Sequence, residues 1–211
     1  RINSKSLSPL LAMFSFLETI CISNGQAQHV DYHQMRVNET FDAFFPEWEP
    51  FDVQEEIEKI ELPKEGIHRL RITYNEDPQS IEVLPYVAKI VKTFALVDSG
   101  EIDYGFKWAE RGFFQSILDA HPEADEVIFH KDGIIQDCTF ANLAFLKEGI
   151  WYTPEAPMHW GTTRARLLVE DQVEETDILV DELDQYERIC LINVFRPLSI
   201  ENSIAIADAI V

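Results

Sequence analysis

Apolar residues in the first half of the chain recur with two different periods, and each period predicts its own type of element. Strict alternation is typical of a strand, whereas apolar residues three and four positions apart are typical of a helix. We therefore expect helices at residues 31–44 and 53–60, and strands at residues 14–23, 68–74, 79–86 and 87–95. Asn24-Gly25 favours a tight turn after the first strand, and Asp31 is a candidate N-cap for the first helix.

The second half of the chain is a series of short apolar runs framed by two helical patterns. Asp132-Gly133 between two such runs is a strong hairpin signal. We expect strands at residues 126–129, 134–139, 142–146 and 150–153, helices at residues 108–120 and 163–170, and further apolar segments at residues 178–183 and 189–194.

The turn residues suggest where the chain divides. Asp98-Ser99-Gly100 is the best candidate for a domain boundary, which gives a small α/β domain at residues 13–97 and a larger one at residues 101–211. Residues 1–12 are polar and are interpreted as an extension outside the functional part. The antiparallel hairpins argue against a doubly wound parallel sheet and favour the α+β class.

Composition narrows the function classes. Acidic residues outnumber basic ones by 38 to 17, for a net charge of −21. Such a surface repels phosphate backbones and disfavours nucleic-acid binding. No run approaches the length of a membrane span. The three cysteines form no CxxC pair and favour a reduced, cytoplasmic setting, and the six histidines lack zinc-site spacing.

The segment Gly161-Thr162-Thr163-Arg164 leaves a loop and enters a helix. Such a start exposes unpaired backbone N–H groups at the positive end of the helix dipole, and threonine hydroxyls add donors. The segment is therefore a candidate anion site. An ordinary threonine-rich helix start with nothing bound is the alternative.

Three further side chains are candidates for chemistry. Lys107 stands among aromatic residues, which favours the neutral amine needed for Schiff-base chemistry, although most lysines are solvated surface charges. Asp137 is the lone acid in an apolar strand and could keep a pyridine nitrogen protonated, or face outward. Arg36 lies one helical turn after His33 and could bind phosphate, or pair with a nearby acid such as Glu39.

The order of these motifs is more specific than any one of them. Along the chain lie Leu17-Glu18-Thr19, His33-Gln34-Met35-Arg36, Lys107, Asp137-Cys138-Thr139-Phe140-Ala141-Asn142, Thr153-Pro154, Gly161-Thr162-Thr163-Arg164 and Leu191-Ile192-Asn193. This series resembles the class IV aminotransferases, a family of branched-chain aminotransferases, D-amino-acid transaminases and aminodeoxychorismate lyases. The resemblance spans roughly residues 14–198 and is most specific at residues 125–164.

The resemblance implies a two-domain α+β enzyme of fold type IV, with mostly antiparallel or mixed sheets and flanking helices, and pyridoxal 5'-phosphate as its cofactor. Lys107, in the larger domain, would form the Schiff base and act as the proton-transfer base. Asp137 would face the pyridine nitrogen. The cofactor phosphate would be held by Arg36, Thr162, Thr163 and Asn193.

The same resemblance ranks the activities. Asn193 after Leu191-Ile192 resembles the lyase branch, so a 4-amino-4-deoxychorismate lyase is preferred over a branched-chain or D-amino-acid aminotransferase. A non-catalytic relative that kept the fold is the third alternative. A homodimer acting on a small amino-acid-type substrate is implied. One departure is that Asp137 stands where most relatives carry glutamate, and another is that Cys138-Thr139 replaces their Gly-Ser.

Overall fold

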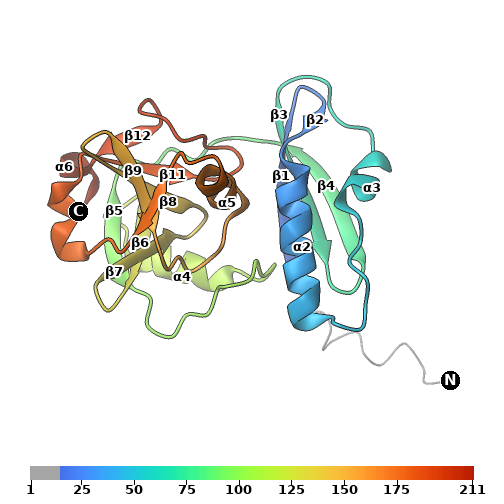
Figure 1. Cartoon of the computed structure of the whole chain (residues 1–211), viewed down its shortest axis with the longest axis horizontal. Helices are drawn as coiled ribbons and strands as arrows, with labels where there is room; N and C mark the ends of the chain where they lie inside the picture. The colour runs from blue at the N-terminus through green and yellow to red at the C-terminus, as the bar shows by residue number, and fades with distance from the viewer. Residues whose placement is uncertain (1–14) are drawn as a thin grey trace. The chain divides into compact units, whose positions relative to one another are not determined.

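The computed structural model describes residues 15–211, which form two compact units (Figure 1). Unit 1 holds the described residues up to Val87 together with the segment Phe106–Arg111. Unit 2 holds Ala88–Gly105 and Gly112–Val211. The extension predicted at residues 1–12 lies outside the described residues.

This division differs from the boundary expected at residues 98–100. The segment that carries Lys107 returns to unit 1 because it extends the unit 1 sheet. Phe16 and Trp108 form an antiparallel bridge, and the Leu17 N–H donates to the Lys107 carbonyl oxygen at 2.9 Å. Lys107 therefore belongs to unit 1 and not to the larger C-terminal unit in which the sequence placed it.

Unit 1 is an antiparallel sheet with helix α2 along one face (Figure 1). The strand order is β2-β1-β3-β4. Its elements are β1 (Phe16–Ser23), β2 (Gln26–Ala27), α2 (Val30–Phe44), α3 (Val53–Glu58), β3 (Ile67–Tyr74) and β4 (Pro78–Pro85). The turn between β1 and β2 is confirmed at Asn24 and Gly25, whose φ angles of 49° and 81° suit a tight hairpin turn.

Alternation along β1 and β3 separates the two faces of this sheet. Successive side chains of a strand point to opposite faces. The face toward α2 carries the core of unit 1, which includes Phe16, Ile20, Ile22, Val37, Phe41, Leu70, Ile72 and Tyr74. The other face, here called the outer face, carries Leu17, Thr19 and Cys21 from β1 and Arg69 and Arg71 from β3.

Unit 2 contains two sheets. One has the order β5-β6-β7 and the other has the order β10-β9-β8-β11-β12. The β5–β6 and β9–β10 pairs are parallel and the remaining pairs are antiparallel. The strands are β5 (Phe94–Asp98), β6 (Glu126–Lys131), β7 (Ile134–Cys138), β8 (Asn142–Lys147), β9 (Ile150–Pro154), β10 (Glu174–Thr176), β11 (Arg188–Ile192) and β12 (Ser203–Ala205), and the helices are α4 (Gly112–Ala120), α5 (Thr162–Val169) and α6 (Ile206–Ala209). The four strands expected between residues 126 and 153 and the helix after them are confirmed, but the strands divide between the two sheets, with β6 and β7 in one and β8 and β9 in the other.

Two predicted elements have different bounds. The strand expected at residues 87–95 is wrong for most of its length, because the N–H groups of Lys92 and Thr93 donate to the Asp125 carboxylate at 2.8 and 3.1 Å and not to a neighbouring strand. The helix expected at residues 108–120 begins only at Gly112, since the residues before it join the unit 1 sheet.

Two local details also differ. Helix α2 begins at Val30, one residue earlier than expected. Its N-cap is His29, whose φ of 54° lies in the left-handed region. Asp31 lies in the first turn, where its charge favours the helix dipole without capping it. The apolar segment at residues 178–183 contributes to a 3₁₀ helix, η2 (Val180–Gln185).

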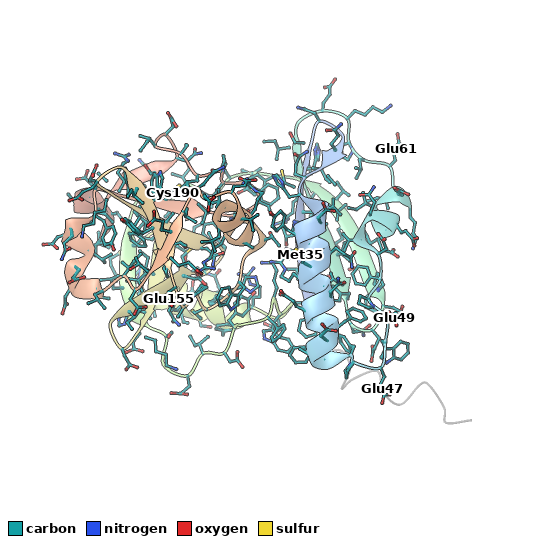
Figure 2. All side chains as sticks on the ribbon, in the orientation of Figure 1. Met35, Glu47, Glu49, Glu61, Glu155 and Cys190 are labelled. Atoms are coloured by element: carbon teal, nitrogen blue, oxygen red, sulfur yellow. The ribbon has the colours of Figure 1, made fainter. Side chains whose placement is uncertain are left out.

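Many acidic side chains are exposed, with Glu18, Glu126 and Asp137 as buried exceptions. Figure 2 labels Glu47, Glu49 and Glu61 on unit 1 and Glu155 on unit 2, all of them exposed, whereas Cys190 on β11 is buried. Within residues 15–211, no helix is long and apolar enough to cross a membrane.

Candidate active site

One group of candidate residues lies in unit 1 around Lys107. The rings of Phe16 and Trp108 stack at 4.5 Å on the α2 side of the sheet. The Ala109 N–H donates to the Ser15 carbonyl oxygen at 2.8 Å, which completes the bridge on the other side of Trp108. The backbone of Lys107 is thus fixed against β1 by regular sheet hydrogen bonds.

The surroundings of Lys107 disfavour its charged form. Desolvation lowers the pKa of its ammonium well below the usual value of 10.5. The guanidinium groups of Arg36, Arg111 and Arg71 lower it further, and only the Glu18 carboxylate opposes them. A neutral amine is the form that attacks a carbonyl carbon, so this environment suits nucleophilic chemistry.

A buried network of three side chains in unit 1 acts electrostatically on Lys107. Arg36 on α2 donates through Nε and Nη2 to the two carboxylate oxygens of Glu18 at 2.8 and 2.5 Å. His33, one turn earlier, lies with Nδ1 2.6 Å from Glu18 Oε2. Its Nε2 is buried and has no hydrogen-bond partner within the described part of the chain. The acid that pairs with Arg36 is therefore Glu18, and not the nearby surface acid considered from the sequence.

Charge pairing within this network outweighs the cost of burial. Burial alone would raise the pKa of Glu18, but Arg36 and His33 lower it to about 2. Desolvation lowers the pKa of His33 despite its contact with Glu18, which keeps the imidazole neutral. Glu18 is thus a fixed anion that orients Arg36.

We expect Glu18→Gln to destabilise the protein by about 3–5 kcal/mol at pH 7, because it leaves the Arg36 guanidinium buried without a counter-charge. The difference in free energy of unfolding between variant and wild type should shrink as pH falls from 4.5 toward about 2. Protonation of Glu18 over this range removes the stabilisation that its ionised carboxylate provides. Urea unfolding across this pH range measures it. The exposed Glu39→Gln is the control, and an equally small effect at both sites would contradict the assignment.

A second group of candidate residues lies in unit 2 around Asp137 on β7. Its side chain is buried. Asn142 Nδ2 donates to Asp137 Oδ1 at 2.7 Å, and the His159 backbone N–H donates to Asp137 Oδ2 at 2.8 Å. Asn142 Nδ2 also donates to the His159 carbonyl oxygen at 2.7 Å. Asp137 therefore faces inward and not outward, and both of its carboxylate oxygens accept hydrogen bonds.

The proton affinity of Asp137 is unusually high. Desolvation raises its pKa from 3.8 to about 7, although the hydrogen bonds from Asn142 and His159 work in the opposite direction. The ionised form of such a carboxyl is stabilised most by a protonated nitrogen placed next to it, because the positive charge offsets the cost of burying the carboxylate.

Helix α5 begins directly beside Asn142. Gly161 is its N-cap, and a Cβ at this position would overlap Asn142 Oδ1. Thr162 and Thr163 form the first turn and are both buried. The first N–H groups of a helix have no partner within the helix and can receive an anion. Asn142 thus connects the Asp137 carboxyl with the candidate anion site.

Arg164 has a structural position in this helix start. Its Nη2 donates to the Pro154 carbonyl oxygen at 2.8 Å and to Glu175 Oε1 at 2.5 Å, and its guanidinium lies 4.8 Å from the centre of the Trp160 ring. These contacts fix the orientation of α5 and hold the arginine itself away from a ligand role.

Gly161→Ala should destabilise the protein by about 1–3 kcal/mol, because the added methyl group displaces an Asn142 side chain that is already buried and bound. Thermal unfolding measures the loss. Gly105→Ala is the matched control, since its added Cβ would meet only Asp103 Oδ1 at an ordinary 3.8 Å. Equal unfolding temperatures for the two variants would contradict the proposed crowding.

Asn193 follows β11, and its side chain is used locally. Its Nδ2 donates to the Phe140 carbonyl oxygen at 3.3 Å, and its Oδ1 accepts the Phe195 N–H at 2.9 Å. Of the predicted site residues, the structure brings Arg36 and Lys107 together in unit 1, and places Asp137, Thr162, Thr163 and Asn193 in unit 2.

Sequence reasoning assigned no role to Glu18, Asn142 or His159. Glu18 could have been found, because it is a lone acid between apolar strand residues, as Asp137 is. His159 acts through its backbone, which leaves no signal in the sequence. Among residues 15–211, no group of three or more histidine, cysteine or acidic side chains is arranged to hold a metal ion.

Both a family profile and a full-length relative match this chain. The profile of the family described as amino-transferase class IV matches residues 119–200, a span that includes Asp137, Thr162 and Thr163. An uncharacterized protein from Haemophilus influenzae is 30% identical over 189 residues, which covers 88% of this chain and 100% of that protein.

Two solved structures agree with this match. A protein from Haemophilus somnus 129PT, provisionally described as a 4-amino-4-deoxychorismate lyase, has a TM-score of 0.82 and 36% identity, and the alignment covers 88% of this chain and 98% of that one. A fold IV transaminase from Curtobacterium pusillum has a TM-score of 0.70 at 18% identity, with 100% and 81% of the two chains covered. The predicted α+β architecture of fold type IV is confirmed. The chain belongs to the class IV aminotransferase family, whose enzymes depend on pyridoxal phosphate.

Proposed function

We propose that this protein binds pyridoxal 5'-phosphate and acts as a 4-amino-4-deoxychorismate lyase. The observation that carries the cofactor proposal is Asp137, a buried carboxyl with a pKa raised to about 7 that is joined through Asn142 to the start of helix α5. The acid suits the protonated ring nitrogen of this cofactor. The nearby helix start, which can receive an anion, suits its phosphate.

The available groups match each reactive part of the cofactor. Lys107 supplies an amine whose pKa is lowered, which suits attack on the cofactor aldehyde. Asp137 suits the pyridine nitrogen. The phosphate is assigned to Arg36, to the backbone N–H and hydroxyl groups of Thr162 and Thr163, and to Asn193. Of these, Asn193 has the weakest support, because its amide already makes two backbone contacts.

In the reaction, the bound cofactor supplies a ring that accepts electrons from the substrate carbon. Lys107 would hold the cofactor covalently, and as a free amine it would remove and return the substrate proton. Asp137 keeps the proton on the pyridine nitrogen. Glu18 holds Arg36 in a fixed orientation, in which the guanidinium would hold the cofactor phosphate.

The lyase is preferred over an aminotransferase for two reasons. The solved relative at 36% identity is provisionally described as a 4-amino-4-deoxychorismate lyase. In addition, Asn193 follows Leu191-Ile192, as the lyase branch suggests. An amino-acid aminotransferase of the branched-chain or D-amino-acid type is the second candidate, favoured by fold neighbours such as the Curtobacterium enzyme.

The two activities differ in their products. Protein loaded with cofactor should convert 4-amino-4-deoxychorismate to p-aminobenzoate and pyruvate without an added amino acceptor. Chromatography of the reaction mixture measures both products. Release of a keto acid only when an acceptor is present, with no p-aminobenzoate, would exclude the lyase in favour of the aminotransferase.

We further propose a cytoplasmic homodimer. All three cysteines are free and buried, which agrees with a reducing compartment. The dimer is proposed from the family resemblance. Sedimentation equilibrium at micromolar concentration tests it, and a monomeric mass would contradict it.

A further inference from the structure

The backbone of His159 binds Asp137, and the imidazole of the same residue makes a separate contact. His159 lies in unit 2, in the loop between β9 and α5. Its Nδ1 lies 3.2 Å from the carbonyl oxygen of Gly105, a residue 54 positions earlier in the chain. A carbonyl oxygen can only accept a hydrogen bond, so Nδ1 carries the hydrogen and donates it. The side chain thus ties the loop to a distant segment of the same unit.

The segment that receives the imidazole is itself well held. The centre of the Tyr104 ring lies 5.7 Å from the centre of the His159 ring. Tyr104 is buried and packs edge-on against Phe114 of α4, with the ring centres 4.9 Å apart. The Gly105 N–H donates to Asp103 Oδ1 at 3.3 Å. The imidazole therefore anchors its loop to a fixed point of unit 2.

Three hydrogen bonds join His159, Asp137 and Asn142 in a closed ring. The His159 N–H donates to Asp137 Oδ2 at 2.8 Å. Asn142 Nδ2 donates to Asp137 Oδ1 and to the His159 carbonyl oxygen, both at 2.7 Å. Both oxygens of the Asp137 carboxylate therefore depend on the position of one loop residue. Oδ2 depends on it directly, and Oδ1 depends on it through the amide that the loop carbonyl orients.

The donors of this ring oppose the effect of burial on Asp137. Desolvation raises the pKa of Asp137 to about 7. Asn142 and the N–H groups of His159 and Met158 lower it, and so does the charge of Arg164 on α5. Hydrogen bonds weaken steeply when donor and acceptor are misaligned. A small displacement of the loop would therefore weaken several donors together and make the ionised carboxylate less stable.

We infer that the His159 imidazole is a positioning group for the Asp137 carboxylate, because its bond to Gly105 fixes the loop whose backbone binds that carboxylate. In this role the imidazole touches neither cofactor nor substrate. Its effect on the carboxyl exists in the cofactor-free chain. Its effect on turnover rests on the proposed function, in which Asp137 faces the pyridine nitrogen and must be held in one direction.

The pKa of Asp137 in the full-length, cofactor-free protein tests this positioning. Carbon-13 NMR of protein labelled at the aspartate Cγ measures it, and the resonance that is missing in Asp137→Asn assigns the signal. The wild type should titrate at about 7. His159→Leu removes the donor and should raise this pKa by at least about 1, which is the change expected when a hydrogen bond to a charged group is lost.

His159→Asn should return the pKa of Asp137 close to the wild-type value. The amide nitrogen of asparagine lies as many bonds from Cα as Nδ1 of histidine does, so it can donate to the Gly105 carbonyl oxygen. Asparagine is neutral, so this recovery identifies the donor as the cause and excludes a charge on the imidazole. If His159→Leu does not fold, His159→Ala removes the same donor and is measured in its place.

His121→Leu is the matched control, since it removes an imidazole of unit 2 whose Nδ1 lies 3.2 Å from Glu123 Oε1. It should leave the pKa of Asp137 unchanged. An unchanged pKa in His159→Leu, no recovery in His159→Asn, or an equal rise in His121→Leu would overturn the inference.

A second measurement separates this inference from the proposed function. Cofactor-loaded His159→Leu should keep the absorption band of lysine-bound cofactor and lose turnover by about tenfold, with recovery in His159→Asn. A wild type without that band or without turnover would count against the proposed function alone, because the pKa of Asp137 is measured without cofactor.

Discussion

Replacing Lys107 with alanine is expected to abolish turnover, by a factor of at least about 10⁴. The amine is the group proposed to bind the cofactor covalently and to move the proton, and no other lysine of the described chain is fixed against β1 in this way. After reduction with borohydride, peptide mass spectrometry should find the cofactor on the peptide that contains Lys107 in the wild type and on no peptide of Lys107→Ala.

The control for this prediction is Lys131→Ala, at the exposed last residue of β6. It should retain turnover and the modified peptide. Partial recovery of Lys107→Ala by added methylamine would support the role of the amine itself. Retention of turnover by Lys107→Ala without any added amine would contradict the assignment.

Asp137→Asn should bind the cofactor and still lose turnover by about 10²–10⁴-fold. The phosphate contacts assigned to Thr162 and Thr163 do not involve the carboxylate, so affinity changes little. The neutral amide cannot keep the pyridine nitrogen protonated, and the ring then accepts electrons poorly. Equilibrium dialysis and single-turnover rates measure the two effects separately, and unchanged turnover would show that Asp137 has only a structural role.

The same substitution predicts a change in stability without the cofactor. Because the folded pKa of Asp137 is raised from 3.8 to about 7, the burial penalty is absent below pH 4, grows as pH rises from 4 to about 7, and is complete above that pH. Asp137→Asn should therefore stabilise the cofactor-free protein at pH 8, by up to about 4 kcal/mol, and have little effect at pH 4. A variant that is less stable than the wild type at pH 8 would contradict the raised pKa.

The local patterns of the sequence predicted most of the elements. The residue types of hairpin turns such as Asn24-Gly25 and Asp132-Gly133 favour the positive φ angles that the turn requires, with little help from the rest of the chain. Both turns are observed. The strand expected at residues 87–95 was wrong because Asp125, far along the chain, provides the hydrogen bonds of this stretch. Asp125 lies outside the short stretch of sequence from which the strand was predicted, so the local pattern could not indicate its contact.

The site shows the same limit. Asp137 and the Gly161 helix start were found because a lone acid in a strand and a glycine before a helix are local signals. The position of Lys107 depends on its segment returning to β1, and the function of Asn142 depends on its contacts with Asp137 and Gly161. Register and long-range contact of this kind are not encoded in residue spacing.

The visible absorption spectrum of the freshly purified protein, incubated with pyridoxal phosphate and freed of excess, tests the central claim most directly. The wild type should show a band at about 410–420 nm from cofactor bound to a lysine, and Lys107→Ala should lack it. A colourless wild-type protein that takes up no added cofactor, or a band that persists in Lys107→Ala, would contradict the account.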